Sequence, residues 1–332
     1  MKALVYTGPK SLEFRDVPEP VAEAGTTLIR IESVGICGSD MHAYLGHDER
    51  RPAPLILGHE AAGTVVSGAD AGRRVTINPL VTCMECSACR SGRENLCARR
   101  QIISMPPREG AFAQFVAMPE RNLVTVPDGI SFDKAALAEP IACGWHAAKM
   151  AERALVPALD DVATLVIGGG AIGVGAALSL KALGVRDITI VEPNALRRRF
   201  LTEKIGLNAC DRDRLASERT FGLVIDAVGM SGSRADASER AAPGGVIVHI
   251  GLGEAAGGLN IRRVTLQEIT FIGTYTYTMA DFHETAEAIF DGRLGPLDWA
   301  EIRPLGEGAK AFSDLLSGAV NSPKIILRPH QD

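Results

Sequence analysis

The sequence predicts an α/β protein in which a doubly wound parallel sheet interrupts an irregular β domain. Between about residues 160 and 275, strand-like and helix-like segments alternate, a pattern typical of a parallel sheet covered by helices. The preceding part has short strands between glycine and proline turns, and the end of the chain is β-like again. With 332 residues, the chain is long enough for two domains. We expect the β domain over residues 1–135 and 286–332, and the sheet domain over residues 136–285.

The predicted β domain consists of short segments rich in β-branched residues. Turn residues flank each segment at both ends, which is the usual signature of a strand. The expected strands are Lys2–Tyr6, Thr27–Ser33, Ala61–Val66, Arg74–Ile77 and, near the end of the chain, Lys324–Arg328.

The predicted sheet domain begins with an apolar strand, Thr164–Ile167, which is followed by a glycine turn and a helix that ends at about Leu183. The stretch Val162–Leu180 carries no charge and approaches the length of a membrane span, but its five glycines favour strand, turn and helix over a membrane helix. The elements expected to follow are a strand at Asp187–Val191, a helix at Asn194–Ile205, and strands at Gly222–Asp226, Gly245–Ile250 and Ile269–Gly273.

Composition and charge exclude several classes of function. The chain has 35 Lys and Arg residues against 40 Asp and Glu residues, so its net charge of -5 leaves no general basic surface for nucleic acid or an anionic membrane. Aromatic residues make up only 5%, which also disfavours a base-stacking surface. Charged residues and a proline interrupt the first apolar stretch, which argues against a secretory signal. We therefore expect a cytoplasmic location in which the seven cysteines bind metal, react or lie buried.

Four of the seven cysteines lie within one short polar segment. Cys83, Cys86, Cys89 and Cys97 form the pattern C-x2-C-x2-C-x7-C. Four thiolates complete the tetrahedral shell of a zinc ion and leave no open position for a substrate. Because the segment has few large apolar residues, metal binding would supply its folding energy. The pattern predicts a structural zinc; the alternatives are chance clustering and a nucleic-acid zinc ribbon, which would need separated cysteine pairs and a basic surface.

A second set of ligand-capable side chains is scattered over three segments. They are Cys37, Ser39, Asp40 and His42 in a glycine-flanked turn, His59 and Glu60 after an apolar strand, and Glu139 at the start of an expected helix. A catalytic zinc takes about three ligands from Cys, His and carboxylate residues and keeps one position open. Cys37, His59 and Glu139 would supply one ligand of each type. Glu60 would coordinate directly or hold a water at the metal. Each residue also has an ordinary alternative, such as a small buried thiol, a loop histidine or a charge at a helix N-terminus.

A glycine-rich turn at the start of the sheet domain predicts a dinucleotide site. Gly168, Gly170 and Gly173 match G-x-G-x-x-G, in which they allow a tight turn, close approach to a pyrophosphate and close packing of helix against strand. Glu192 follows Gly173 by 19 residues, where it can accept hydrogen bonds from the ribose hydroxyls of NAD and would repel the 2′-phosphate of NADP. Arg197–Arg199 keep NADP open as the less favoured alternative, because an arginine could receive that phosphate. For Arg198 and Arg199 we favour the other interpretation, a solvated basic face of a helix.

Together, these motifs make the sequence resemble the zinc-dependent medium-chain alcohol dehydrogenases over nearly the whole chain. The resemblance rests on Gly-Ile-Cys-Gly-Ser-Asp, Gly-His-Glu, the four-cysteine segment, Glu-Pro, Gly-Gly-Gly-Ala-Ile-Gly and Asp226-Ala-Val-Gly. It implies a GroES-like catalytic domain, a Rossmann nucleotide domain, two zinc ions per chain, and a homotetramer or homodimer. The cofactor contacts that it implies, beyond the glycine turn and Glu192, are Ile172, Arg197, Val228 and Gly251.

The reaction that this resemblance implies is the reversible oxidation of a secondary alcohol to a ketone with NAD. Glu139 followed by proline resembles the branch that acts on polyols such as sorbitol and on threonine, so we expect a polyol, sugar alcohol or sugar acid as substrate. Zinc would act as a Lewis acid, Ser39 would take the hydroxyl proton and pass it towards His42, and hydride would pass to the nicotinamide. Asp40 would fix the tautomer of His59. The alternatives are a threonine 3-dehydrogenase-like or short-diol enzyme and an inactive structural relative, although none of the expected ligands is missing.

Two features depart from the family pattern or refine it. The stretch between Asn208 and Phe221 is short, so we expect one peripheral helix of the sheet domain to be trimmed. The loop Gly46–Pro52 is polar and charged, which hints at a hydroxylated or acidic substrate, although surface loops are commonly polar in any case.

Overall fold

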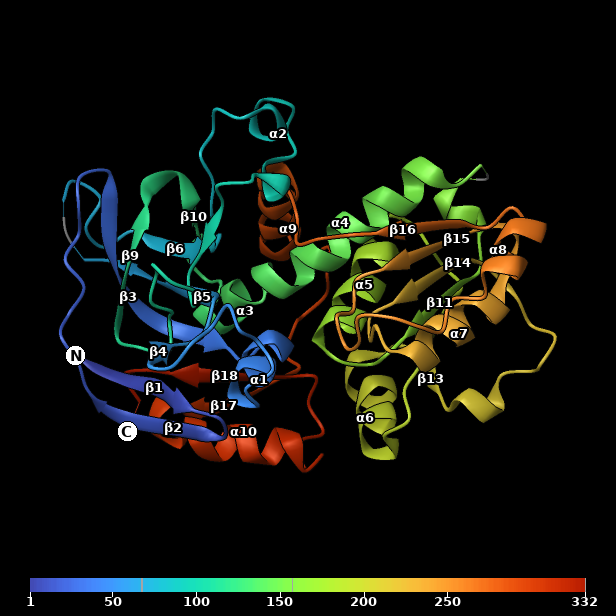
Figure 1. Ribbon diagram of the computed structural model, residues 1–332. Helices are drawn as coiled ribbons and strands as arrows, with labels where there is room; N and C mark the ends of the chain where they lie inside the picture. The colour runs from blue at the N-terminus through green and yellow to red at the C-terminus, as the bar shows by residue number, and fades with distance from the viewer. Residues whose placement is uncertain (67, 157, 332) are drawn as a thin grey trace. The chain divides into compact units, whose positions relative to one another are not determined.

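The computed structural model describes residues 1–66, 68–156 and 158–331, which separate into two compact units (Figure 1). The β unit comprises Met1–Glu139, Thr278–Gly292 and Ala300–Asp332, and the sheet unit comprises Pro140–Tyr277 and Arg293–Trp299. The chain returns to the β unit at Thr278, earlier than the expected residue 286. The reason is helix α9 (Met279–Phe290), whose Phe290 packs on the small core of Ala135 and Ala136.

The β unit is an irregular assembly of short strands and a few helices. Its largest sheet has the order β10-β6-β5-β3-β18-β17, with β9 also paired to β3, and smaller sheets have the orders β2-β1-β4 and β7-β8 among the described residues. The strands are β1 (Lys2–Gly8), β2 (Ser11–Asp16), β3 (Thr26–Gly35), β4 (Leu55–Ile56), β5 (Glu60–Val65), β6 (Arg74–Ile77), β7 (Leu80–Val81), β8 (Gln101–Ile102), β9 (Phe115–Pro119), β10 (Leu123–Thr125), β17 (Ala300–Pro304) and β18 (Lys324–Arg328). The helices are α1 (Gly38–Tyr44), α2 (Ser87–Arg90), α3 (Phe132–Ala136), α9 and α10 (Gly308–Leu316).

The register of three neighbouring strands brings distant parts of the sequence together. Gly35, the last residue of β3, pairs with Glu60, the first residue of β5, and also with Ile326 of β18. Cys37 comes two residues after Gly35, and Lys324 comes two residues before Ile326. The ends of β3, β5 and β18 therefore meet at one place, and this meeting point becomes the candidate site.

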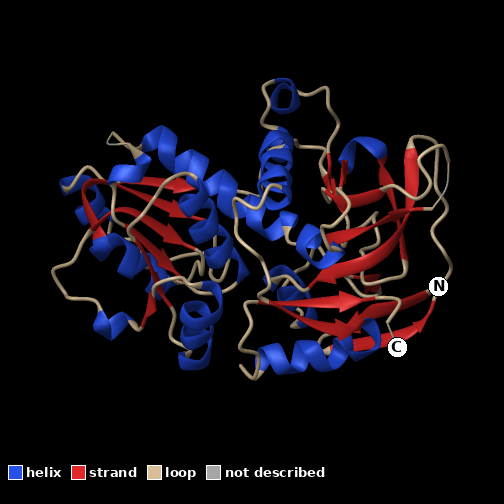
Figure 2. Cartoon of the chain, turned by 180° about the vertical axis from the view of Figure 1, so that it is seen from behind, coloured by secondary structure: helices blue, strands red, loops and turns tan. Residues whose placement is uncertain are grey.

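The sheet unit confirms the predicted doubly wound parallel sheet. Its strands follow the order β13-β12-β11-β14-β15-β16 and pair in parallel throughout the described residues. Figure 2 shows them as one layer with helices beside both faces. The strands are β11 (Thr164–Ile167), β12 (Ile188–Val191), β13 (Ala209–Cys210), β14 (Phe221–Asp226), β15 (Ala241–His249) and β16 (Thr270–Gly273), and the helices are α4 (Ala138–Ala154), α5 (Ala171–Ala182), α6 (Ala195–Phe200), α7 (Ser231–Arg240) and α8 (Ile261–Leu266).

The predicted elements of the sheet unit are present, with two adjustments. The helix expected over Asn194–Ile205 is α-helical only as α6 and continues as a π-helical turn, Leu201–Ile205, which ends at Gly206 with a φ of 74°. Between β13 and β14 the described chain forms a single 3-10 turn, Arg212–Arg214, where we expected a trimmed helix. No helix of the described residues is long and apolar enough to cross a membrane.

Doubly wound sheets bind ligands outside the carboxyl ends of their strands, where the strand order reverses. In the sheet unit this reversal lies between β11 and β14. From β11 the chain adds strands on one side (β12, β13), and from β14 it adds strands on the other side (β15, β16). The glycine turn after β11 is therefore in the position that the dinucleotide prediction requires.

Candidate functional site

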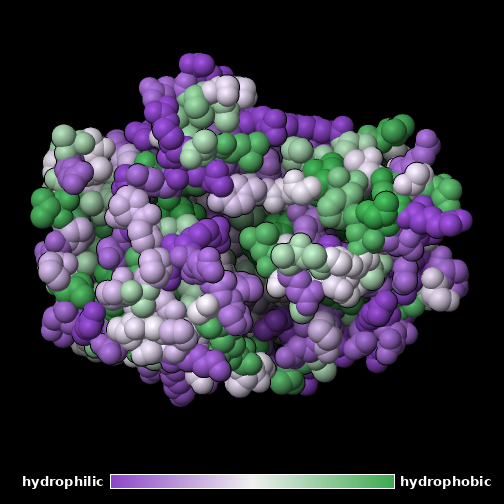
Figure 3. All heavy atoms as spheres, in the orientation of Figure 1, coloured by the Kyte–Doolittle hydropathy of each residue, from purple (hydrophilic) through white to green (hydrophobic). Residues whose placement is uncertain are grey.

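The four-cysteine segment forms a compact cluster of sulfur atoms in the β unit. The Sγ–Sγ distances are 3.8 Å for Cys83 and Cys89, 3.5 Å for Cys86 and Cys89, and 3.4 Å for Cys97 and Cys83. A tetrahedron of sulfurs around zinc, with bonds of about 2.3 Å, has edges of about 3.8 Å. All four thiols are free, so the spacing reflects no disulfide. The residues present therefore fit a closed zinc site, and polar side chains cover its outer rim at the top of the view in Figure 3.

Backbone hydrogen bonds and burial shift the thiol pKa values of this cluster in opposite directions. The backbone N–H of Glu85 lowers the pKa of the Cys83 thiol to about 6, and the N–H of Cys89 lowers the pKa of Cys86. Burial and the neighbouring sulfur of Cys86 raise the pKa of Cys89 to about 12. The cluster thus stabilises some thiolates and disfavours others, and a bound divalent cation would stabilise all of them together.

A second cluster forms where β3, β5 and β18 meet. Ligand atoms of Cys37, His59 and Glu60 all lie within 4.8 Å of one another, with His59 and Glu60 buried and Cys37 half-buried. Gly58 lets the chain reach this point, because its φ is 89° and a Cβ there would lie 2.5 Å from the ring of Phe112. Thiolate, imidazole and carboxylate are the ligand types of catalytic zinc, so the donor set fits that metal.

The buried carboxylate of Asp40 joins the two ligand-bearing segments of this cluster. It accepts hydrogen bonds from Cys37 N at 2.9 Å and Gly58 N at 3.2 Å, and its Oδ1 lies 3.5 Å from Nδ1 of His59. Burial alone would raise the pKa of Asp40, but His59, Arg51 and the Cys37 N–H outweigh it and lower that pKa. In turn, Asp40 and Cys37 overcome burial and hold the pKa of His59 well above its usual value. A place that favours positive charge this strongly suits a cation.

Lys324 is a buried cation beside the cluster that the sequence did not single out. Its Nζ lies 2.6 Å from both carboxylate oxygens of Glu60 and donates to Ile36 O at 2.9 Å, and both side chains of the pair are almost fully buried. Burial disfavours the charged amine, yet Glu60, Cys37 and, more weakly, Glu139 raise the pKa of Lys324. The only signal in the sequence was a lysine at the start of an apolar strand.

Glu139, the other predicted carboxylate ligand, stays a prediction as a zinc ligand. It is the second residue of α4, is buried, and is not in the group of Cys37, His59 and Glu60 defined above for the described residues. It lies near enough to Lys324 to affect the pKa of that residue. The structure therefore places Glu139 near the site, while Glu60 supplies the carboxylate in the cluster itself.

The predicted proton-relay residues lie on α1 next to an unexpected buried arginine. Ser39 and His42 are three residues apart on this helix, a spacing that places them on one face. Ser39 Oγ accepts from Arg51 Nη2 at 3.5 Å. Arg51 Nε donates to Ser104 O at 3.0 Å, and Ser104 Oγ lies 3.4 Å from His59 Nδ1. The loop Gly46–Pro52 is thus partly internal to the site, and its charges do not all face solvent.

The glycine turn has the geometry that the dinucleotide motif requires. Gly168 has a φ of 100°, and a Cβ on Gly173 would lie 1.8 Å from the carbonyl oxygen of Gly168. A Cβ on Gly170 would meet no atom within 4 Å, so the approach to the start of α5 is open. These three positions provide the turn, the open approach and the tight packing that we expected.

The Glu192 carboxylate is held by two backbone N–H groups, one in the glycine turn and one just after Glu192 itself. Its Oε2 accepts from Gly169 N at 2.9 Å and its Oε1 accepts from Asn194 N at 2.8 Å, and it is 5% exposed. Arg198, interpreted from the sequence as part of a solvated face, instead donates to the carbonyls of Glu192 and Pro193 at 2.7 Å each. Arg199 does lie on the exposed face. Arg198 therefore braces the end of the strand that carries Glu192.

Asp226 organises the loops that carry the other predicted cofactor contacts. Its carboxylate accepts from Val228 N at 3.0 Å and Gly229 N at 2.9 Å, and its carbonyl accepts from Gly251 N at 3.1 Å. Burial raises its pKa, but His249 and these backbone donors outweigh burial and lower it. Ile172 and Arg197, the remaining predicted contacts, are half-buried at the starts of α5 and α6.

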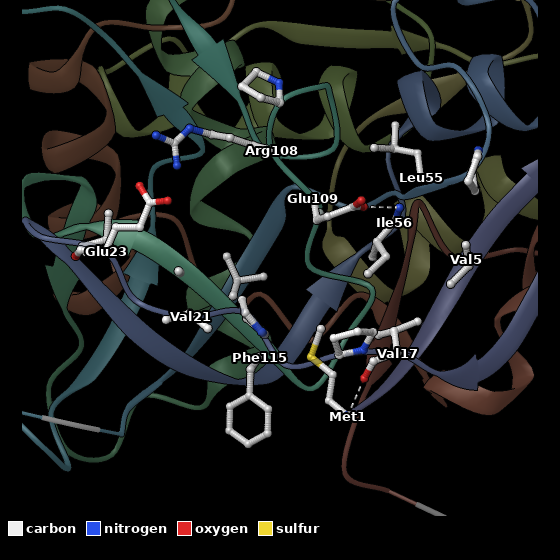
Figure 4. A pocket seen from close by; sticks show the side chains of 18 of the residues that line it. Met1, Val5, Val17, Val21, Glu23, Leu55, Ile56, Arg108, Glu109 and Phe115 are labelled. Atoms are coloured by element: carbon white, nitrogen blue, oxygen red, sulfur yellow. Dashed lines mark hydrogen bonds between the residues drawn. The ribbon is translucent and has the colours of Figure 1, made fainter.

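A separate groove of about 720 Å³ lies on the β unit (Figure 4). Its walls include Glu23, Arg108 and Phe115, and Glu109 accepts from Ile56 N at 2.6 Å inside it. None of the predicted site residues lines this groove. It therefore adds nothing to the candidate site.

The comparisons with known proteins agree with this geometry. The family described as "Alcohol dehydrogenase GroES-like domain" matches residues 23–128, and the family described as "Zinc-binding dehydrogenase" matches residues 171–291. The L-galactonate-5-dehydrogenase of Escherichia coli is 31% identical over 89% of this chain and 88% of that protein. The sorbitol dehydrogenase of Bacillus subtilis is 31% identical over 83% of this chain and 82% of that protein. A solved structure of acetophenone reductase from Geotrichum candidum in complex with NAD matches with a TM-score of 0.88 and 26% identity, over 100% of this chain and 98% of that one.

Proposed function

The chain belongs to the zinc-dependent medium-chain alcohol dehydrogenases, and from that premise we propose that it oxidises a polyol or sugar acid reversibly to a ketone with NAD. The observation that carries the proposal is the cluster of Cys37, His59 and Glu60, which brings three zinc-ligand types together from separate segments. The sugar-acid and sorbitol dehydrogenases among its relatives support this substrate class.

The residues that would hold the catalytic zinc are Cys37, His59 and a carboxylate from Glu60 or Glu139. When bound there, zinc supplies the positive charge that makes an alcohol hydroxyl more acidic. Lys324 Nζ contacts both carboxylate oxygens of Glu60 and holds that side chain in place. Asp40 orients His59 through Nδ1, which leaves Nε2 as the ligand atom.

The proton of the substrate hydroxyl would pass through the residues of α1. Ser39 Oγ would accept it while its own hydrogen moves on towards His42, which lies on the same helix face. Oxidation of the alcohol also removes a hydride from the carbon, and NAD, when bound, accepts it. The chain contributes the position of the alcohol and the path of the proton.

The sheet unit would bind NAD at the glycine turn. The open approach at Gly170 and the start of α5 suit a pyrophosphate, because free N–H groups at a helix start attract anions. Glu192 would accept hydrogen bonds from the adenosine ribose and oppose the 2′-phosphate of NADP. Its contacts with Gly169 N and Asn194 N hold the carboxylate at the turn before any ligand binds.

The four-cysteine cluster would hold a second, structural zinc. Its four sulfurs fill the coordination shell, so the metal there would stabilise the segment without taking part in the reaction.

The proposed assembly is a homotetramer or homodimer in the cytoplasm. Among the described strands, β16 is an edge of the sheet unit, and Ile261 and Leu266 just before it are exposed. An open strand edge beside exposed apolar side chains supports a symmetric contact between copies. The seven free cysteines support a reducing compartment.

A substrate panel tests the proposed function. The purified protein is assayed by NADH absorbance with sorbitol, xylitol, galactitol, L-idonate, L-threonine and butanediol. We expect turnover with a polyol or sugar acid, and none in a Cys37→Ser variant measured beside it. Turnover only with L-threonine or butanediol would contradict the substrate class, and no turnover with any alcohol would contradict the function.

A further inference from the structure

Arg51 is a buried arginine in the interior of the β unit. Its side chain is 1% exposed, and its guanidinium donates to three acceptors: Asp48 Oδ2 at 2.6 Å, Ser104 O at 3.0 Å and Ser39 Oγ at 3.5 Å. Burying a charge is costly unless it is paired and hydrogen-bonded, so such a residue needs an explanation. Two of these partners belong to the proposed site or contact it: Ser39 is the proposed relay residue, and Ser104 Oγ lies 3.4 Å from His59 Nδ1.

The neighbouring Arg50 provides a contrast within the same loop. Arg50 also binds Asp48, through Nε at 2.8 Å and Nη2 at 2.9 Å, but its side chain is 60% exposed. Both arginines therefore bind the carboxylate of Asp48, and Arg51 also donates hydrogen bonds to Ser39 and Ser104. Anchoring the loop on Asp48 does not require the second arginine to reach the helix that carries Ser39.

We propose that Arg51 is a positioning residue that sets the direction of the Ser39 hydroxyl for proton transfer; this inference rests on the proposed dehydrogenase function. A guanidinium has only donors and stays charged at any pH that the protein tolerates. The hydrogen of Ser39 therefore cannot point at Arg51, and it must point towards another acceptor. One unproductive orientation of the relay hydroxyl is removed, and one lone pair of its oxygen is occupied.

The charge of Arg51 also suits the step that Ser39 performs. The Ser39 oxygen accepts the substrate proton while the hydroxyl hydrogen of Ser39 leaves. If that hydrogen leaves before the substrate proton is fully transferred, the oxygen carries negative charge. A fixed cation at 3.5 Å stabilises that charge without moving. The same guanidinium holds the Ser104 carbonyl, and Ser104 Oγ faces His59, so one side chain aligns the relay and the ligand.

A double-mutant cycle separates positioning from loop anchoring. Arg51→Met, Ser39→Ala and the double variant are compared as full-length, zinc-loaded protein, with Arg50→Met as the matched control. We expect Arg51→Met to lower kcat roughly 10- to 100-fold with a smaller change in KM, because it removes a charge-assisted hydrogen bond at the relay. In the Ser39→Ala background the same change should lower kcat less than about twofold, since its target is gone. Arg50→Met should stay within about twofold of the wild type.

A second variant and two readouts other than turnover guard against misfolding. Arg51→Lys keeps the charge but cannot bind three acceptors in a fork, so it should lower kcat in a Ser39-dependent manner as well. Zinc content and the affinity for NADH should match the wild type in both Arg51 variants. Equal losses of kcat with and without Ser39, or loss of zinc with kcat, would overturn the positioning role while leaving an active wild type and the proposed function intact. An inactive wild type would overturn the proposed function, and the role of Arg51 with it.

Discussion

The two metal-ligand clusters of the β unit are built in opposite ways. The four-cysteine cluster takes all its ligand atoms from one segment, Cys83–Cys97, and the backbone of that same segment lowers the pKa of Cys83 and Cys86. The cluster of Cys37, His59 and Glu60 depends on strand register, and its supporting charges come from as far away as Lys324. The first cluster is a local structure that a metal can fold, whereas the second is a product of the fold.

This difference explains the buried charges around the second cluster. A site that stays open to a substrate cannot surround its metal with thiolates, so other groups must fix the ligands. Asp40 holds His59, and Lys324 holds Glu60. The four-cysteine cluster would need no such partners, because a bound metal would hold its four sulfurs together.

Replacing Cys37, the cysteine of the second cluster, should give the largest effect, because it removes a proposed catalytic ligand and leaves the four-cysteine cluster unchanged. Cys37→Ser should lower turnover at least about 1,000-fold, because a Lewis-acid metal contributes several kcal/mol and each 1.36 kcal/mol is a factor of ten. The variant should remain folded with about one zinc per chain. Cys210→Ser, in β13 and outside both clusters, is the matched control and should keep full turnover and both zinc ions. Loss of both zinc ions from Cys37→Ser would refute the independence of the two sites.

Removing the positive charge of Lys324 should destabilise the fold as well as the proposed zinc site. Lys324→Met leaves Glu60 buried without its cation, and breaking a buried pair in this way costs about 3–5 kcal/mol of the free energy of unfolding. Urea denaturation measures the loss. Lys324→Met combined with Glu60→Gln should recover much of it, because the unpaired charge is then gone. A loss of less than about 1 kcal/mol in the single variant would mean that the pair does not support the open site.

The predicted dinucleotide site combines both kinds of construction. Its glycines, Gly168–Gly173, lie in one segment, whereas Glu192 comes from the end of the next strand. Glu192→Ala should raise the KM for NAD roughly tenfold and narrow the preference over NADP, because a hydrogen bond to a charged group is lost and the repulsion of the 2′-phosphate disappears. Initial rates with both cofactors measure the change, with the exposed Arg199→Ala as control. An unchanged ratio of NAD to NADP use would show that Glu192 serves only to hold Gly169 and Asn194.

The smallest expected effect concerns the pH dependence of the Asp48 pair. Burial raises the pKa of Asp48, but hydrogen bonds from Arg50 and the charge of Arg51 outweigh burial and lower it to about 2. A depressed folded-state pKa stabilises the fold above the unfolded value of about 3.9 and loses that contribution as the pH falls towards 2. The wild type should therefore exceed Asp48→Asn in melting temperature at pH 7, and the difference should shrink between about pH 4 and pH 2. A difference that does not vary with pH would contradict the ionised pair.

The sequence predicted those features whose residues all lie within one short segment. The four cysteines, the glycine turn and the strands of the parallel sheet follow from spacing and apolar pattern, and the structure contains them. Lys324, Arg51 and Ser104 could not be predicted, because their importance arises from long-range strand pairing and loop packing. A lone lysine or arginine in a sequence is normally a solvated charge. Arg198 was misread for the same reason, since only the folded chain shows its contact with the carbonyl of Glu192.

The central claim is that one cluster holds a removable, reactive metal and the other a structural metal. Zinc content, turnover and far-UV circular dichroism are followed together while a chelator removes metal from the unmodified protein. We expect two zinc ions per chain at the start, with turnover lost as the first is released and the fold retained until the second leaves. A single zinc per chain, or turnover that persists until the second is released, would contradict the division between the two clusters.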